Sequence, residues 1–185
     1  MIHLFLNEKL FIPDEYHKTI YDINYNKLYD SGFRLILIDL DNTIIPYDID
    51  LPDEKIKNHF KKIEEIGFKI IIISNNKEGR IKKFSDALGY KYVFSAKKPF
   101  ARGFKKAIKM TDFKNDKVVL IGDQLMTDVF GGKRIKLYVC LVDALKRSTE
   151  KWYTRMNRRI ENRMIEKIKR KNINKYTELK LEEKK

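Results

Sequence analysis

The stretch LILIDLDNT, residues 35–43, decides how the rest of this sequence is interpreted. An unbroken apolar run that ends abruptly in two aspartates predicts a strand buried on both faces of a parallel sheet. The carboxyl end of such a strand lies at the edge where open α/β sheets bind their ligands. Because side chains alternate along a strand, Asp39 and Asp41 project to the same side. Two carboxylates this close resist joint ionisation, which suits a nucleophile paired with a general acid.

The composition excludes several classes of protein. A chain of 185 residues with 43% hydrophobic content can form one globular domain with a full core. No window approaches the length of a membrane-spanning apolar segment, and residues 1–6 are too short and too soon followed by charge for a secretory signal. We therefore expect a cytoplasmic protein. The single cysteine, Cys140, lies inside an apolar run and is expected in the core without a disulfide.

Three further apolar runs are each followed by polar residues of chemical interest. Residues 68–73 are followed by Ser74 and Asn75, residues 90–95 by Lys98, and residues 117–121 by Gly122, Asp123 and Asp128. Taken singly, Ser74 could equally be a helix N-cap, and Lys98 is one of 40 basic residues. The carboxyl ends of parallel strands share one edge, so we expect these side chains to meet there. Apolar residues at helical spacing predict helices between the runs, over residues 52–67, 77–89 and 99–110.

The order of these residues resembles the four motifs of the haloacid dehalogenase-like (HAD) phosphohydrolases. The resemblance implies that Asp39 attacks phosphorus and that Asp41 acts as acid and base. It also implies a Rossmann-like parallel sheet flanked by helices. The other implied roles are phosphate binding by Ser74, charge neutralisation by Lys98, substrate contact by Thr43 and Asn75, and Mg²⁺ binding by Asp39, the carbonyl of Asp41, Asp123 and, less directly, Asp128.

The resemblance can be narrowed to one branch of the superfamily. The strings PDEY at 13–16, YDI at 21–23 and GDQLMTD at 122–128, with Pro46 and the glycines 131–132, resemble the YqeG branch of HAD subfamily IIIA. Tyr47 stands where tryptophan is expected in that branch. The branch includes phosphatidylglycerophosphatases, so the resemblance implies a phosphomonoester substrate, most specifically a phospholipid headgroup. The segments between the motifs leave no room for a cap domain, and a capless site suits a bulky substrate or a small one enclosed by oligomerisation.

The chain is expected to divide into three parts. Residues 1–145 form the phosphatase domain, with lead-in helices at Asp14–Ile20 and Tyr25–Ser31. Residues 146–171 carry eleven Lys or Arg against three Glu, with apolar residues recurring every four positions, and predict a basic amphipathic helix. The lysine-rich residues 172–185 are expected to form a flexible tail.

The net charge of +14 leaves the partner open. A general bias towards lysine could supply part of it, and the C-terminal helix could simply dock on the core with a solvated basic back. Alternatively, it could lie on an anionic membrane with Trp152 and Tyr153 near the headgroups, which would make the protein peripheral at the inner face. Two rival functions remain: the same chemistry on a soluble or nucleic-acid ester, and a nucleic-acid-binding module on a phosphatase frame. The complete set of motifs makes nucleic acid the weaker expectation.

Overall fold

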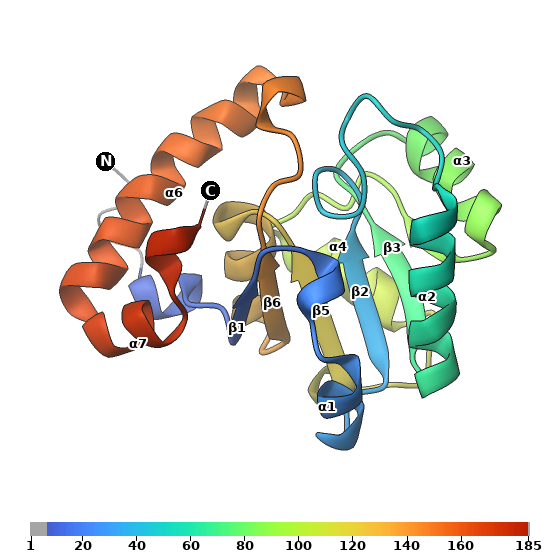
Figure 1. Cartoon of the computed structure of the whole chain (residues 1–185), viewed down its shortest axis with the longest axis horizontal. Coiled ribbons are helices and arrows are strands. Elements are labelled where there is room, and N and C mark those ends of the chain that lie inside the picture. Colours follow the sequence, from blue (N-terminus) through green and yellow to red (C-terminus); the bar gives the residue numbers. More distant parts are fainter. Residues whose placement is uncertain (1–6, 185) are drawn as a thin grey trace.

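A computed structural model of the chain describes residues 7–184, apart from the side chain of Tyr153, so residues 1–6 of the expected N-terminus lie outside it. The described chain contains a six-stranded sheet in the order β1-β6-β5-β2-β3-β4 (Figure 1). Every neighbouring pair of strands is parallel. The strands are β1 (Glu15–His17), β2 (Leu35–Asp39), β3 (Lys69–Ile73), β4 (Lys91–Val93), β5 (Val118–Gly122) and β6 (Tyr138–Val142).

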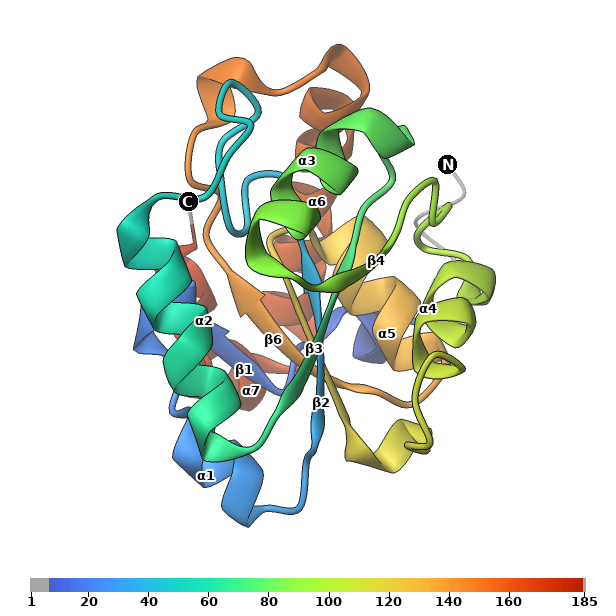
Figure 2. The same cartoon turned by 90° about the vertical axis from the view of Figure 1, so that its right-hand side faces the viewer.

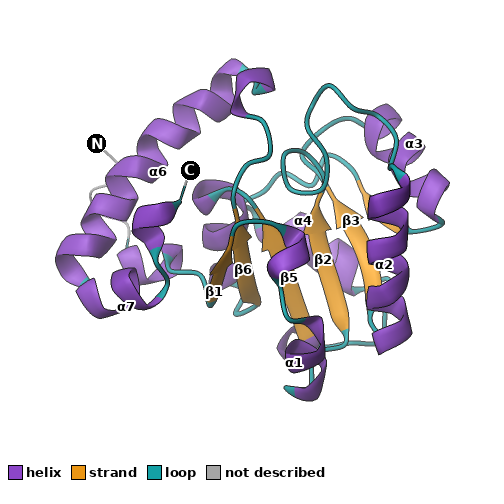
Figure 3. Cartoon of the chain, viewed as in Figure 1, coloured by secondary structure: helices purple, strands orange, loops and turns teal. Residues whose placement is uncertain are grey.

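Helices cover both faces of this sheet, as expected for a Rossmann-like α/β fold (Figures 2 and 3). The helices are α1 (Tyr25–Asp30), α2 (Glu54–Ile66), α3 (Glu78–Leu88), α4 (Ala101–Ile108), α5 (Phe130–Arg134), α6 (Trp152–Lys171) and α7 (Ile173–Glu178). Between β2 and β3 the chain forms only a loop and α2, and between β3 and β4 only α3 and its connections. The described chain therefore has no domain inserted between these strands.

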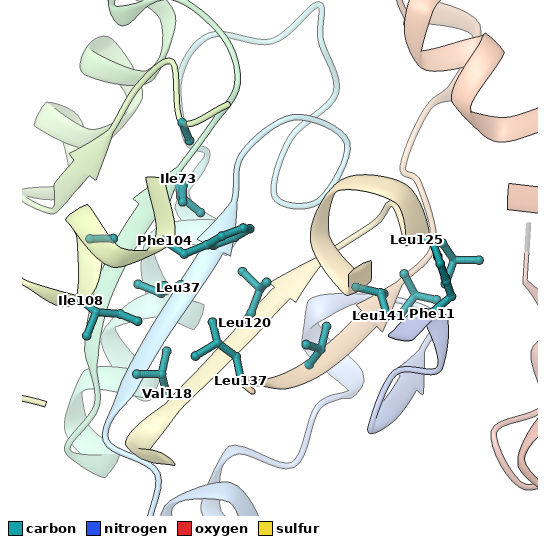
Figure 4. Packing of buried hydrophobic residues seen from close by; sticks show 14 of the residues in the cluster. Phe11, Leu37, Ile73, Phe104, Ile108, Val118, Leu120, Leu125, Leu137 and Leu141 are labelled. Atoms are coloured by element: carbon teal, nitrogen blue, oxygen red, sulfur yellow. The ribbon is translucent and has the colours of Figure 1, made fainter. Parts of the chain in front are cut away.

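The sheet separates two hydrophobic cores. Leu35 and Leu37 of β2 pack into one core with Phe104 of α4 (Figure 4), and the alternate residues Ile36 and Ile38 pack into the other. All five residues of β2 are buried, because a central strand of a parallel sheet is covered on both sides. The prediction for Cys140 is confirmed, since it is buried in β6 as a free thiol.

The predicted helix Asp14–Ile20 is wrong. Glu15–His17 form the edge strand β1, which pairs with β6 in parallel. Asp14 reinforces the pairing, because its main-chain N–H donates to the carbonyl of Val139 and its carboxylate accepts from the N–H of the same residue. The second lead-in helix is confirmed as α1, which ends one residue before Ser31.

The prediction of a flexible tail is also wrong for the described residues 172–184. Helix α7 packs against the end of α6, and Tyr176, Leu179 and Leu181 are buried in the first core. Further along, the ammonium group of Lys184 donates to the main-chain carbonyls of Val142 and Asp123. Burial of these three side chains stabilises the docking of a segment whose composition is otherwise lysine-rich.

The basic helix α6 is docked along part of its length. Met164 and Ile168 are buried in the core, whereas Trp152 is 73% exposed and Met156 is 50% exposed. The regular apolar stripe is therefore covered only in its second half, and Thr154, Arg158 and Glu161 face inwards nearer the start of the helix. Among the described residues, no helix has the length and apolar character needed to cross a membrane.

Candidate active site

The four sequence motifs meet at the carboxyl end of the sheet. Asp39 is the last residue of β2, and Asp123 follows β5, the strand hydrogen-bonded next to it. Lys98 reaches the same point from the loop after β4, and its side chain is almost completely buried. Parallel strands bring their carboxyl ends to one edge, so residues more than 80 positions apart become neighbours.

Lys98 lies between two aspartates. Its ammonium group donates hydrogen bonds to Asp39 and, at 2.7 Å, to Asp128, and all three side chains are buried. Burial alone would lower the pKa of Lys98, but the attraction of Asp128 and Asp39 outweighs it and raises the pKa above its usual value. The lysine therefore carries a fixed positive charge beside Asp39.

Asp39 has an unfavourable electrostatic environment. Burial raises its pKa well above the usual carboxyl value, and Asp128, Asp123 and Asp41 act in the same direction, whereas Lys98 opposes them. Burial likewise raises the pKa of Asp128. A buried excess of negative charge is stabilised by a bound cation.

One oxygen from each of Asp39, Asp123 and Asp128 lies within 4.8 Å of the others. This set of carboxylate oxygens fits a divalent cation such as Mg²⁺, which prefers oxygen ligands. Thr43 connects two members of the set, because its hydroxyl donates to Asp39 at 3.5 Å and to Asp123 at 3.3 Å. The geometry thus places Thr43 among the acidic ligands.

Gly122 lets Asp128 approach the site. A Cβ atom at position 122 would lie 2.3 Å from the carboxyl carbon of Asp128, a distance that side chains do not tolerate. The main-chain N–H of Gln124 and the hydroxyl of Thr127 donate to the other side of the Asp128 carboxylate. The Gly-Asp pair of this motif therefore has a steric reason as well as a chemical one.

The Asp41 carboxylate is not part of the acidic set and is surrounded by hydrogen-bond donors. Its carboxylate accepts hydrogen bonds from the Ser74 hydroxyl at 2.9 Å, the Asn76 amide at 2.7 Å and the Arg80 Nε at 2.7 Å. Arg80 of α3 is not among the site residues predicted from the sequence. Its position in the first turn of the helix after the second motif could have indicated that its guanidinium reaches the active site.

Asn75, for which substrate contact is predicted, lines the pocket and also holds the backbone of Lys98. Its side chain brackets the backbone of Lys98, accepting from the Lys98 N–H at 2.7 Å and donating to the Lys98 carbonyl at 3.1 Å. In this structure the amide therefore fixes the position of the lysine. Ser74 also donates to Asp41, so its hydroxyl lies in the site but is already engaged.

The residue that sequence reasoning missed most clearly is Arg158 of α6. Its guanidinium donates to the carboxylate and the carbonyl of Asp123, and also to Glu150 and Glu161. Burial opposes its charge, but Asp123, Glu161 and Glu150 together raise its pKa. In sequence it is one arginine among many in a basic helix, so only its placement distinguishes it.

Comparison with known proteins agrees with this geometry. A family model of haloacid dehalogenase-like hydrolases matches residues 3–136. The chain belongs to the haloacid dehalogenase-like hydrolases. It is 38% identical over 164 residues to the probable phosphatase YqeG of Bacillus subtilis, covering 89% of this chain and 95% of that protein.

Solved structures of low sequence identity share the fold. A putative 3-deoxy-D-manno-octulosonate 8-phosphate phosphatase from Vibrio cholerae superposes with a TM-score of 0.50 at 15% identity, covering 63% of this chain and 69% of that one. An uncharacterised protein from Listeria monocytogenes also gives 0.50, at 16% identity, covering 60% of this chain and 79% of that one. These similarities concern the HAD fold alone.

Proposed function

We propose that this HAD hydrolase is a phosphatase that cleaves phosphomonoesters through a covalent aspartyl-phosphate on Asp39. A carboxylate oxygen of Asp39 attacks phosphorus while the ester bond to the leaving oxygen breaks, and Asp41 gives that oxygen a proton. Asp41 then takes a proton from water, which attacks phosphorus, releases inorganic phosphate and restores the Asp39 carboxylate. The observation that carries this proposal is the buried Lys98 fixed between Asp39 and Asp128.

The surrounding groups suit a transferring phosphoryl group. Lys98 is positively charged and donates to the nucleophile Asp39, and the Ser74 hydroxyl donates to Asp41. Bound by Asp39, Asp123 and Asp128, Mg²⁺ would offset the charge of the phosphoryl oxygens. The identity to a probable phosphatase over most of both chains supports the same reaction.

We further propose that the physiological substrate is phosphatidylglycerophosphate, presented at an anionic membrane. The support is the surface around the active site. Of the seven large apolar side chains that are exposed in the described chain, all except Ile173 belong to segments at the carboxyl edge of the sheet or to the start of α6. We call this set the apolar rim: Ile49, Leu51, Phe100, Leu145, Trp152 and Met156.

Basic residues accompany the apolar rim. The loop after β2 and the segment before α6 both extend beyond the carboxyl ends of the strands (Figure 1). Lys146, Arg147, Lys151, Arg155 and Arg159 are exposed along the second of these segments and the first half of α6. At about 1 kcal/mol for each basic residue near an anionic surface, four of them would supply about 4 kcal/mol. The apolar rim would add interfacial burial to this attraction, giving reversible membrane contact.

The proposed function is tested by magnesium-dependent phosphate release from phosphatidylglycerophosphate in mixed micelles. Soluble phosphomonoesters and 5′- and 3′-phosphorylated oligonucleotides serve as competing substrates. We expect preference for the lipid and no turnover by Asp39→Asn, which should remain folded by circular dichroism. Residual turnover by that variant would refute the covalent mechanism, and preference for a soluble or nucleic-acid ester would refute the lipid assignment alone.

Membrane contact has its own control. The double variant Leu51→Ser, Trp152→Ser should lose sedimentation with vesicles of phosphatidylglycerol, whereas Ile173→Ser should sediment like the wild type. Ile173 is 53% exposed and belongs to α7, away from the active-site edge. Equal sedimentation of all three proteins would contradict the membrane proposal. Salt-sensitive binding to RNA or DNA without magnesium would instead favour a nucleic-acid-binding module.

A further inference from the structure

The first half of α6 forms one wall of the catalytic pocket. The pocket encloses about 200 Å³ above Asp39 and Lys98, and Thr154 and Asn157 of α6 line it together with Tyr47 and Met126. HAD enzymes without an inserted domain are expected to have an open site, yet here a C-terminal helix closes one side of it. A volume of this size has room for a phosphoryl group and the adjacent atoms of its leaving group.

Hydrogen bonds and ion pairs attach this helix to residues of the active-site motifs. Arg158 joins α6 to Asp123, and Glu150, just before the helix, accepts from both Arg158 and the Asn42 side chain at 3.0 Å and 3.2 Å. On the other side of the opening, Lys151 donates to Asn76 at 2.7 Å. The start of α6 is thus held both at the motif after β2 and at the motif after β3. Its pocket-lining side chains are therefore in fixed positions.

The wall that α6 contributes is polar but uncharged. Thr154 offers a hydroxyl and Asn157 an amide, and Tyr47 lies beside Thr154 with its pKa raised by burial and by Asp39 and Asp41. The one basic side chain lining the pocket, within the described chain, is Lys98, which is already paired with two aspartates. A carboxylate or second phosphate on the leaving group would find no cationic partner inside. A neutral hydroxyl would find donors and acceptors.

We propose that α6 is the cap of this active site, and that Asn157 and Thr154 select a leaving group carrying an uncharged hydroxyl next to the scissile ester. The proposal rests on the phosphatase reaction proposed above, and it deepens the substrate assignment. A glycerol unit fits the requirement, because its free hydroxyl lies one carbon from the esterified one. Any charged group further along the molecule would emerge at the mouth of the pocket, where Lys151 and Arg155 are exposed.

The test compares two soluble esters that differ only in hydroxyl groups, sn-glycerol 1-phosphate and n-propyl phosphate. The quantity measured is the ratio of their kcat/KM values in the full-length protein. Loss of one neutral hydrogen bond to the substrate corresponds to about a tenfold change. We therefore expect Asn157→Leu and Thr154→Val each to lower the ratio about tenfold, and Thr154→Ser, which keeps the hydroxyl, to retain it.

Asn162→Leu is the matched control, since Asn162 is exposed on the same helix. It should leave both kcat/KM values unchanged. A wild-type kcat/KM ratio near one would overturn the inference. Absence of turnover on both esters would overturn it as well. So would an unchanged ratio in both Asn157→Leu and Thr154→Val. Failure of phosphatidylglycerophosphate hydrolysis with normal turnover of the soluble esters would refute the lipid substrate and leave the role of α6 standing.

Discussion

Arg158 gives the sharpest test of how α6 is attached. Replacement by methionine keeps much of the apolar stem but leaves the carboxylates of Asp123, Glu150 and Glu161 without their shared cation. Removing one partner of a buried ion pair costs about 3–5 kcal/mol, because the remaining charge stays buried and uncompensated. A protein of this kind has a free energy of unfolding of about 5–15 kcal/mol. Arg158→Met should therefore remove a large share of the stability.

Urea denaturation at pH 7.5, followed by circular dichroism, measures this loss. With a slope of about 2 kcal/mol per molar urea, the midpoint should fall by about 1.5–2.5 M. Arg159→Met, the exposed neighbour on the same helix, should stay within about 0.5 kcal/mol of the wild type. If Arg158→Met behaved like Arg159→Met, the buried network would not hold the helix and the argument would be refuted.

The pH dependence of the same variant follows from Glu161. Burial raises the pKa of Glu161, and Arg158 opposes that shift, so its removal should raise the pKa further. A folded-state pKa above the unfolded value means that the native protein binds the proton more tightly, and stability is gained as the pH falls through that pKa. The deficit of Arg158→Met relative to the wild type should therefore narrow between pH 7.5 and pH 5. A deficit that widened on acidification would contradict this assignment.

Two further substitutions test other parts of the structure. Gly122→Ala should displace Asp128, since the added Cβ would lie 2.3 Å from its carboxyl carbon, and should lower kcat/KM by roughly 100-fold. Gly79→Ala, where the new Cβ would meet open space outside its own helix, is its control and should retain activity. Leu181→Ala should cost about 2–4 kcal/mol in urea denaturation because Leu181 is 1% exposed, whereas Ile173→Ala should change stability little. If the end of the chain were mobile, Leu181→Ala and Ile173→Ala would have the same free energy of unfolding.

Sequence reasoning succeeded where a local pattern determines the local structure. The apolar run before Asp39 predicts a buried strand, which β2 confirms, and Gly67 ends α2 in the left-handed conformation, with φ at 112°. The meeting of Asp39, Lys98 and Asp123 followed from one topological rule about parallel strands. The fold and the assembly of the motifs at one edge were therefore predictable.

It failed where a distant partner determines the structure. Glu15–His17 has no apolar alternation and forms a strand because β6 offers a free edge for pairing. Leu181 is buried because it packs into the first hydrophobic core, which is formed by residues distant in sequence. Arg158 is surrounded by other basic residues in sequence, and nothing local shows that its charge is compensated by Asp123, 35 positions earlier. Such pairings depend on residues that are distant in sequence, so the local composition of each segment does not reveal them.

The position of α6 changes how the absence of an inserted cap should be interpreted. A cap placed between the motifs is joined to the core by linkers and can close independently of the catalytic groups. Here Arg158 of the covering helix α6 binds the carboxylate and the carbonyl of Asp123. The same guanidinium therefore positions both the acidic site and the wall of the pocket. In the proposed role of α6 as cap, Thr154 and Asn157, which line the pocket, would limit the size of the group that enters it. The proposed membrane contact of the apolar rim would then bring a headgroup to the mouth of this pocket.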